Sequence, residues 1–392
     1  MNKSTLWLLG ALNMIAPFTY DAYLGALPQI TSELHTTTAA TQFTIVANLV
    51  GMTIGMMIGG SLSDTIGRRK PVIFALAFYV LASIAIIQVQ TIDWFIFLRL
   101  MQGLAGGAMV SVSQAMVRDY TEGKDSARVF SILLLIKSIG PIVAPLVGAF
   151  ILLAGNWRLI FAFLAVLGVM FFVWAIFSLE DSLVQERRLP LSLGGVFGGW
   201  GTVFRDRLFL AAGITSFLNT FALFAYFSTA TFALQKDFGL TPFTFGIFMV
   251  INGCALILFR TVNTRLLGRL SFYTVYRIGM MVGFASAVVL VISAIVQSSF
   301  VLFSAGLFLM TGSLGFLVPN ALNLAMMNHK NNAGSAAGLA GFIGSVAGFL
   351  STALVGHLVG DSSVGLAIYI AIPMALAGTS LLLYRQKHSA GH

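Results

Sequence analysis

The sequence predicts an all-α membrane protein with twelve transmembrane helices in two six-helix bundles. Of its 392 residues, 58% are hydrophobic and only 9% are charged, whereas about a quarter of the residues in a soluble domain are charged. The apolar residues form runs of about 20, a length that spans a hydrocarbon core of roughly 30 Å as a helix. The longest polar interruption, residues 180–207, leaves six of these runs on either side.

The apolar runs give the predicted order of the helices. We expect spans at 6–27, 42–63, 71–90, 94–117, 128–152, 158–179, 208–233, 243–262, 274–296, 299–325, 334–358 and 365–384. The first run could be a secretory signal, but it contains Asp21 and lacks a small-residue cleavage site, so we interpret it as a retained helix. The predicted parts are an N-terminal bundle (1–179), a cytoplasmic linker (180–207) and a C-terminal bundle (208–392).

The placement of basic residues predicts the orientation. If the N-terminus is cytoplasmic, most of the 22 Lys and Arg residues lie in cytoplasmic segments, and only Arg158 and Lys236 lie outside. This bias accounts for the net charge of +9 without a nucleic-acid partner, and the chain has no zinc-finger spacing. A single cysteine, Cys254, excludes a disulfide within the chain. We expect no metal and no cofactor.

Asp21 is the acidic residue that falls inside a predicted span. It lies roughly 22 Å along the first span from Leu6. A carboxylate at membrane depth costs about 2.5 kcal/mol or more, so it should face a cavity, a partner or a proton. The position favours proton coupling or substrate binding, and the alternative is a structural ion pair near the outer boundary.

Two cations also fall inside predicted spans. Arg99 lies at a depth similar to that of Asp21, and because arginine does not readily lose its proton it would tune the carboxylate; the alternative is snorkelling. Lys137 lies near mid-membrane. Two cations against one carboxylate hint at an anionic substrate, although Lys137 could instead snorkel or pair with Asp21. Candidate cavity walls are the polar or aromatic residues Tyr20, Tyr23, Asn219 and Tyr226.

A short basic turn separates the second and third spans. A carboxylate at Asp64, near a helix N-terminus, is favoured by roughly 0.3–1 kcal/mol. Gly60 and Gly67 bracket the turn, and Arg68 and Arg69 can bind carboxylates or lipid phosphates. We interpret these five residues as a cytoplasmic gate, and the alternative is topological anchoring alone.

The fifth predicted span carries small residues at a spacing of four. Gly140 and Gly148 lie on one face, with Ala144 between them, and allow close helix contact. Pro141 and Pro145 remove backbone donors and favour a kink. This helix is predicted to act as a seal or pivot between the bundles.

Five segments together resemble the major facilitator superfamily and, within it, the drug:proton antiporters of the Bcr/CflA type. They are the turn at 60–71, the Arg-x-x-Gln-Gly segment at 99–103, the antiporter motif at 140–149, the Tyr-Asp-x-Tyr-Leu segment at 20–28 and the Gly-rich segment at 333–341. The sequence departs from the family at four positions: Thr65 replaces the usual basic residue, Ala144 and Ala149 stand where glycine is common, and Gly25 stands where proline is common.

The resemblance implies the major facilitator fold and a proton-coupled secondary transporter that exports small molecules, as in drug or multidrug efflux by alternating access. It also implies a monomer in the bacterial inner membrane with both termini cytoplasmic, whose partners are a small-molecule substrate, protons and the lipid bilayer. In that fold helices 1 and 4 line the cavity, so Asp21 and Arg99 could pair. No nucleophile–base constellation indicates an enzyme.

Two alternatives stay open. Arg99 and Lys137 favour an exporter of an endogenous anionic metabolite, such as a nucleoside, an amino-acid derivative or a metallophore. A membrane receptor or structural subunit that does not transport is the alternative from another class, but such a protein has no need of an acid within a span.

Overall fold

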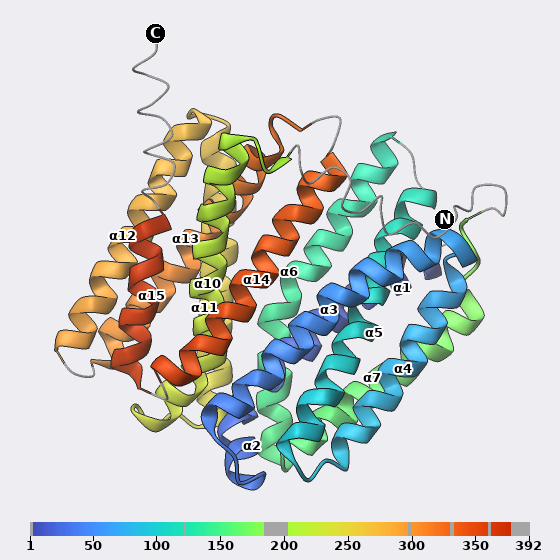
Figure 1. Cartoon of the computed structure of the whole chain (residues 1–392), viewed down its shortest axis with the longest axis horizontal. Helices are drawn as coiled ribbons and strands as arrows, with labels where there is room; N and C mark the ends of the chain where they lie inside the picture. The colour runs from blue at the N-terminus through green and yellow to red at the C-terminus, as the bar shows by residue number, and fades with distance from the viewer. Residues whose placement is uncertain are drawn as a thin grey trace. The chain divides into compact units, whose positions relative to one another are not determined.

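The computed structural model describes residues 3–120, 123–183, 203–296, 299–329, 333–359 and 362–377. Within these ranges the regular structure is entirely helical, which confirms the predicted fold class (Figure 1). Nine of the described helices are long and apolar enough to cross a membrane, and Ile139–Ala154 and Ser363–Ala377 are shorter apolar helices. Most of the predicted linker lies outside the described residues, and the predicted domain boundaries stay predictions.

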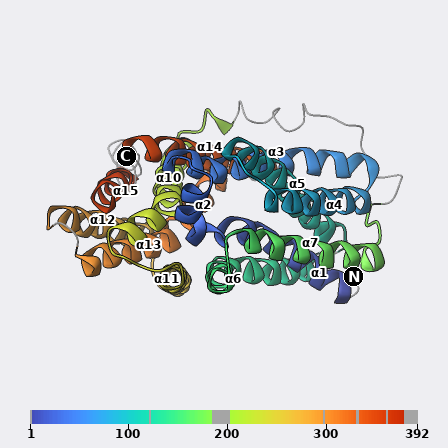
Figure 2. The ribbon, with the colours of Figure 1, turned by 90° about the horizontal axis from the view of Figure 1, so that it is seen from below.

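The chain divides into two compact units, and the first residues of α11, Pro242–Ile247, group with the first unit. The helices of the first unit are α1 (Lys3–Asp21), η1 (Leu24–Ala26), α2 (Leu27–Glu33), α3 (Thr38–Ile66), α4 (Arg69–Ile87), α5 (Ile92–Tyr120), α6 (Gly123–Ala154) and α7 (Arg158–Ser178). Figure 2 shows α3, α4 and α5 on one side of this unit and α1, α6 and α7 on the other.

The second unit is built from α10 (Arg207–Lys236), α11 (Pro242–Leu267), α12 (Phe272–Ile295), α13 (Phe300–Met326), α14 (Ala333–Leu358) and α15 (Ser363–Ala377). Side-chain caps begin several of these helices. Asp206 accepts a hydrogen bond from the Leu208 N–H at 2.8 Å, and Ser271 accepts one from the Thr274 N–H at 3.3 Å. Such caps satisfy N–H groups that have no partner within the helix. The predicted last span is described only as far as Ala377.

The first span differs from its prediction, because the helix does not continue to residue 27. Helix α1 ends at Asp21, and a short turn, η1 and α2 follow it. Pro28 gives the physical reason: it has no N–H to donate, and in a continuous helix its ring would collide with the carbonyl of Leu24. Asp21 is therefore the last residue of α1, beside a break in the helix.

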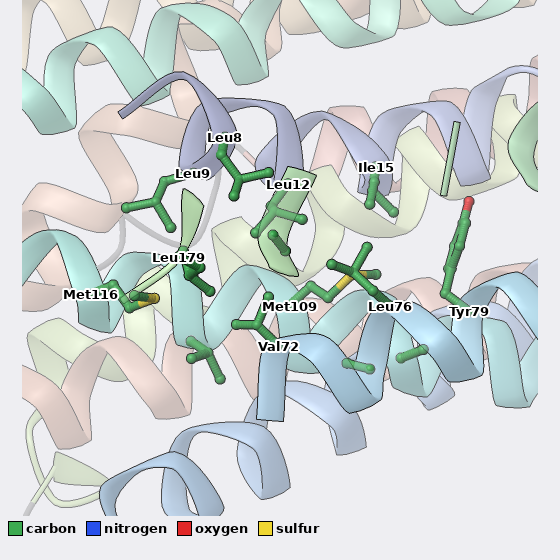
Figure 3. Packing of buried hydrophobic residues seen from close by; sticks show 14 of the residues in the cluster. Leu8, Leu9, Leu12, Ile15, Val72, Leu76, Tyr79, Met109, Met116 and Leu179 are labelled. Atoms are coloured by element: carbon green, nitrogen blue, oxygen red, sulfur yellow. The ribbon is translucent and has the colours of Figure 1, made fainter. Parts of the chain in front are cut away.

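A cluster of buried apolar side chains joins α1 to α4 and α5 (Figure 3). Its labelled members are Leu8, Leu9, Leu12, Ile15, Val72, Leu76, Tyr79, Met109, Met116 and Leu179. Burial of such side chains holds the helices of this unit together by van der Waals packing, which drives helix association where lipid replaces water.

Helices α3 and α5 approach so closely that their backbones touch. Glycine occupies every fourth position of α3 along this contact, at Gly51, Gly55 and Gly59. A Cβ atom at Gly55 would overlap the carbonyl oxygen of Leu104, and one at Gly107 would overlap the carbonyl oxygen of Met52. This small-residue stripe fixes α3 onto α5.

Gly107→Ala is expected to destabilise the protein by about 1–3 kcal/mol, because the added methyl group forces the two backbones apart. The neighbouring Gly106 is the matched control, since a Cβ atom there meets nothing within 4 Å. Thermal unfolding of the two purified variants in detergent measures the difference. Equal melting temperatures for Gly107→Ala and Gly106→Ala would contradict the close packing of α3 on α5.

Candidate functional site

Arg99 is a fully buried cation held by neutral groups. From α5, its guanidinium donates to the Gln102 Oε1 at 2.6 Å and to the carbonyl oxygen of Thr19 at 3.0 Å. The guanidinium carbon also lies 4.3 Å from the centre of the Tyr23 ring. No described carboxylate forms an ion pair with it. A buried charge without a counterion is costly, so this arrangement is expected to serve a purpose other than stability.

The groups that hold Arg99 are themselves held in a ring of hydrogen bonds. The Thr19 hydroxyl lies 2.6 Å from the Tyr79 hydroxyl on α4. Gln102 donates to the Ser83 hydroxyl at 2.8 Å, and Ser83 donates to the carbonyl oxygen of Tyr79 at 2.8 Å. The ring joins α1, α4 and α5 and leaves the Arg99 guanidinium little freedom to turn.

Aromatic rings pack behind the guanidinium. Tyr23 packs against Phe161 and Phe95 with ring centres 5.8 Å and 6.5 Å apart. Trp157 packs against Phe95 at 5.4 Å and Phe161 at 5.9 Å. All four side chains are fully buried. The negative face of the Tyr23 ring partly compensates the charge of Arg99, and the other rings fix the orientation of Tyr23.

The aromatic cluster is anchored by Glu33 at the end of α2. Trp157 donates its indole N–H to the Glu33 Oε2 at 2.7 Å, and Arg158 pairs with the other carboxylate oxygen. Arg158 also donates to the carbonyl oxygens of Ile87 and Val89, at 3.1 Å and 3.0 Å. This clamp connects α2 and α7 to the end of α4.

Glu33→Gln is expected to lower the unfolding free energy by about 1 kcal/mol, since the pair is partly exposed and Arg158 keeps its carbonyl partners. The matched control is Glu180→Gln, which removes an exposed carboxylate elsewhere in the same unit. Melting temperatures in detergent measure both. A shift for Glu180→Gln as large as that for Glu33→Gln would show that the clamp does not stabilise this end of the unit.

In the sequence, Asp21 lies between Thr19 and Tyr23, which both contact Arg99. Only 5% of the Asp21 surface is exposed. The predicted pairing with Arg99 is not formed. The Asp21 carboxylate has no hydrogen bond or ion pair with a described residue, and Arg99 donates to the Thr19 carbonyl oxygen instead. Tyr20, the residue before it, is half-buried. The acid and the cation thus share one region of the first unit without neutralising each other through a direct contact.

Helix α6 packs along α1 on both sides of Asp21. A Cβ atom at Gly140 would overlap the ring of Pro17, and one at Gly148 would overlap the carbonyl oxygen of Ala22. The helix continues through Pro141 and Pro145 without interruption. The predicted close contact of this motif therefore brings α6 against the end of α1 that carries Asp21. The side chain of the fifth candidate on this helix, Lys137, lies outside the described residues.

Two candidate residues belong to the second unit. The Tyr226 hydroxyl donates to the Met249 sulfur at 3.0 Å. Asn219 lies two turns before Tyr226 on α10, is fully buried, and its amide has no hydrogen-bond partner among the described residues. A buried amide without a partner is costly, so Asn219 is the more informative of the two.

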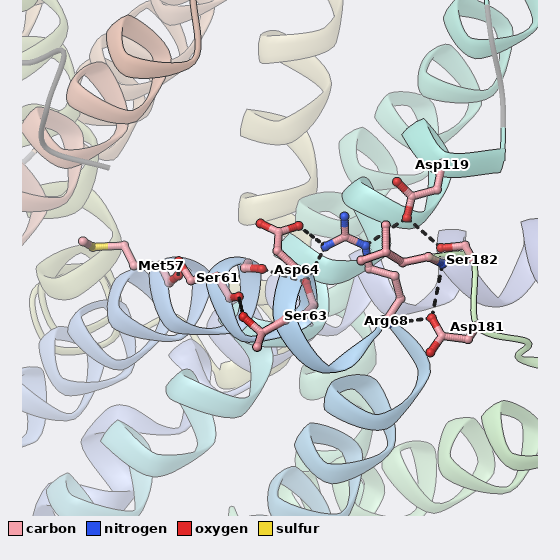
Figure 4. Close-up of polar contacts among 11 residues, drawn as sticks. Met57, Ser61, Ser63, Asp64, Arg68, Asp119, Asp181 and Ser182 are labelled. Atoms are coloured by element: carbon pink, nitrogen blue, oxygen red, sulfur yellow. Dashed lines mark hydrogen bonds and ion pairs between the residues drawn. The ribbon is translucent and has the colours of Figure 1, made fainter. Parts of the chain in front are cut away.

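The predicted gate is an ion-pair network centred on Arg68 (Figure 4). Its guanidinium donates to the Asp119 Oδ2 at 2.9 Å, to the Asp64 Oδ1 at 2.6 Å and to the Ser63 hydroxyl at 2.7 Å. Its backbone N–H donates to the Asp181 Oδ1 at 2.8 Å. Burial disfavours the charged guanidinium, but the hydrogen bonds to Asp119 and Asp64 outweigh it and raise the pKa of Arg68.

The other gate residues shape the turn and attach it to the end of α7. Gly67 ends α3 with φ of 92°, a left-handed conformation that favours glycine. A Cβ atom at Gly60 would lie 3.0 Å from the Ser111 hydroxyl. Arg69 donates to the carbonyl oxygen of Ile176 at 2.8 Å, and Ser182 donates to the Asp119 Oδ2 at 2.8 Å. The turn is thus tied to the start of the polar segment that follows α7.

Sequence reasoning did not find several of these residues. In the sequence, Asp119 and Asp181 are ordinary charged residues at the ends of predicted helices. Thr19, Tyr79 and Ser83 are ordinary polar residues within apolar runs. Glu33 and Arg158 are far apart in sequence, so no local pattern connects them. Only the glycines of α3, at a spacing of four, carried a signal that could have been read.

A sequence profile of the Major Facilitator Superfamily matches residues 9–352. The chain belongs to the major facilitator superfamily. It is 30% identical over 352 residues to the uncharacterized MFS-type transporter YdgK of Bacillus subtilis, covering 89% of this chain and 88% of that one. It is 24% identical over 355 residues to a bicyclomycin resistance protein homolog of Haemophilus influenzae, covering 91% and 89%. It is 28% identical over 244 residues to the multidrug resistance protein MdtL of Klebsiella pneumoniae, covering 62% and 61%.

Solved structures of the superfamily share the fold. A point mutant of the nucleoside transporter NupG superimposes with a TM-score of 0.78 at 13% identity, covering 97% of this chain and 100% of that one. The xylose transporter XylE from E. coli, in a partially occluded inward-open conformation, gives 0.73 at 14% identity, covering 97% of each. The predicted resemblance to the superfamily is confirmed, and the resistance names of two relatives agree with the Bcr/CflA type. The protein is a multi-pass membrane transporter and not an enzyme.

Proposed function

We propose that this transporter exports small molecules, drugs among them, in exchange for protons by alternating access. The observation that carries the proposal is the placement of Asp21, an almost fully buried acid beside the groups that hold the buried Arg99. A carboxylate at this depth is expensive unless it binds a proton or a partner. The resistance names of two relatives support a drug as the substrate.

In the proposed cycle, Asp21 takes up a proton from the outside and releases it to the cytoplasm after the change of state. Arg99 stays charged throughout, because arginine does not readily lose its proton, and tunes the Asp21 carboxylate. Substrate binds while Asp21 is deprotonated and leaves when it is protonated. Coupling requires that proton and substrate bind the two states with different affinities. Tyr20, Tyr23, Lys137, Asn219 and Tyr226 are the proposed substrate contacts.

The network around Arg68 is the proposed cytoplasmic gate. Its two carboxylates and its link to the segment after α7 must separate or rearrange if the turn moves, so the network would stabilise one state of the transporter over the other. We also propose a monomer in the bacterial inner membrane. The distribution of Lys and Arg supports the cytoplasmic placement of both termini.

Everted membrane vesicles test the function directly. Vesicles are acidified by respiration, and recovery of a pH-sensitive dye is followed after addition of ethidium (cationic), chloramphenicol (neutral) or fluorescein (anionic). We expect recovery with the cationic or neutral compound. No recovery with any of the three, in vesicles that contain folded protein, would contradict proton-coupled drug export.

The second candidate is export of an endogenous anion, and the buried Arg99 favours it because no described carboxylate pairs with it. Recovery of the dye signal with fluorescein alone would support this candidate over drug export.

A further inference from the structure

A groove opens on the first unit between α3 and α4. Both helices pack along α5 but make little contact with each other, so α5 forms the floor between them. The walls include Ile58 and Leu62 of α3 and Phe74 and Phe78 of α4, and the floor includes Ala105 and Ala108 of α5. The groove has a volume of about 560 Å³, within the range of about 300–1,000 Å³ that ligand pockets occupy.

The shape of the groove follows from the small residues beneath it. The glycine stripe allows α3 to pack closely on α5, and Gly55 and Gly59 of that stripe also line the groove. Alanines on α5 add depth. The rim on α4 is open to the outside of the unit, since Phe74 is 71% exposed and Leu81 is 64% exposed. Exposed apolar side chains on a membrane-spanning helix are suited to contact with lipid, so a lipid chain can enter the groove from the side.

One end of the groove is positively charged. Ile66 and Pro71 line the groove at the turn between α3 and α4, and Lys70 and Arg69 directly precede Pro71. Both cations are exposed, and neither forms an ion pair with a described carboxylate. Arg69 donates to the Ile176 carbonyl oxygen through one guanidinium nitrogen, and a guanidinium has further N–H donors that a phosphate can accept from. The neighbouring Arg68 differs, because two carboxylates already bind it (Figure 4). The positive end of the α4 helix dipole adds to the charge at the same place.

We propose that the groove binds one acyl chain of an anionic glycerophospholipid, whose phosphate lies at Arg69 and Lys70. The two halves of such a lipid match the two parts of the site: an apolar channel at membrane depth and a pair of cations at its interfacial end. A zwitterionic lipid offers the same chain but carries its own ammonium group, which the two cations repel. The lipid would occupy the leaflet that the α3–α4 turn faces, apart from Asp21 and Arg99, so the site does not depend on the proposed transport reaction.

Native mass spectrometry of the purified transporter tests the site. The protein in detergent is given equal amounts of phosphatidylglycerol and phosphatidylcholine with identical acyl chains, and retained lipid is counted. Wild type is expected to retain phosphatidylglycerol at least about tenfold over phosphatidylcholine, because each basic residue at the headgroup favours the anionic lipid several-fold. The double variant Arg69→Gln/Lys70→Gln should lose that preference.

Two further variants test the headgroup site and the groove separately. Arg269→Gln/Arg277→Gln, which removes two exposed cations of the second unit, should leave the preference unchanged. Ala77→Leu, which fills part of the groove from its α4 wall, should reduce retention of both lipids. Equal retention of the two lipids by wild type, or an unchanged preference in Arg69→Gln/Lys70→Gln, would overturn the headgroup assignment. Undiminished retention by folded Ala77→Leu would overturn the assignment to the groove.

Discussion

Asp21→Asn is expected to abolish proton movement coupled to substrate while the protein stays folded. Asparagine has nearly the shape of aspartate but cannot bind and release a proton at this position. The substitution breaks no hydrogen bond or ion pair with a described residue, and it removes a charge that is costly at membrane depth. Its melting temperature should therefore equal or exceed that of wild type. Proteoliposomes containing an internal pH indicator measure the proton movement when a transported compound is added.

The matched control for this change is Asp93→Asn, an exposed carboxylate in the first turn of α5, which should leave coupling intact. Exchange of labelled for unlabelled substrate separates coupling from binding, since it needs no net proton movement. We expect Asp21→Asn to retain some exchange. If Asp21→Asn accumulates substrate against a gradient as well as wild type does, Asp21 is not the coupling residue.

Arg99→Lys is expected to reduce transport by about tenfold or more. A hydrogen bond from a charged group contributes about 1.5–3 kcal/mol, and lysine cannot reproduce both hydrogen bonds that the Arg99 guanidinium donates. The planar guanidinium reaches the Thr19 carbonyl and Gln102 at once and lies over the Tyr23 ring. Lysine keeps the charge but loses this geometry. The effect should appear in the uptake rate and in the pH at which transport is half-maximal, since the field at Asp21 changes with the position of the cation.

Arg118→Lys is the control for this substitution, because Arg118 is exposed at the other end of the same helix. A drop in transport without any change in pH dependence would indicate that Arg99 is structural and does not tune Asp21. Normal transport by Arg99→Lys would show that only the charge matters and that the ring of hydrogen bonds around it has no functional role.

The helices could be predicted from the sequence because each is recorded in a local pattern. A run of about 20 apolar residues has few alternatives to a membrane helix, since its backbone must satisfy its own hydrogen bonds in lipid. The interruption after Asp21 could not be predicted with the same ease. Pro28 carried the signal, but it lies seven residues beyond the place where the helix ends.

The candidate site was predictable in part for a similar reason. A charge inside an apolar run is conspicuous, so Asp21 and Arg99 could be selected without any knowledge of their surroundings. The residues that hold Arg99 in place could not be selected from the sequence. Thr19, Tyr79 and Ser83 are ordinary polar residues until the packing of α1, α4 and α5 brings them into one ring.

The sequence by itself determined the all-helical fold class, the order of the apolar helices, the family, and which charged residues are unusual. These properties depend on the cost of moving each residue into lipid, which is a property of the residue and its near neighbours. The tertiary structure alone decided which groups meet: that Arg99 is held by Thr19 and Gln102 rather than by Asp21, and that Arg68 binds Asp119 and Asp181. Such contacts depend on how helices distant in sequence approach one another. Between α3 and α5, glycines allow the close approach, because any side chain at these positions would keep the two backbones apart.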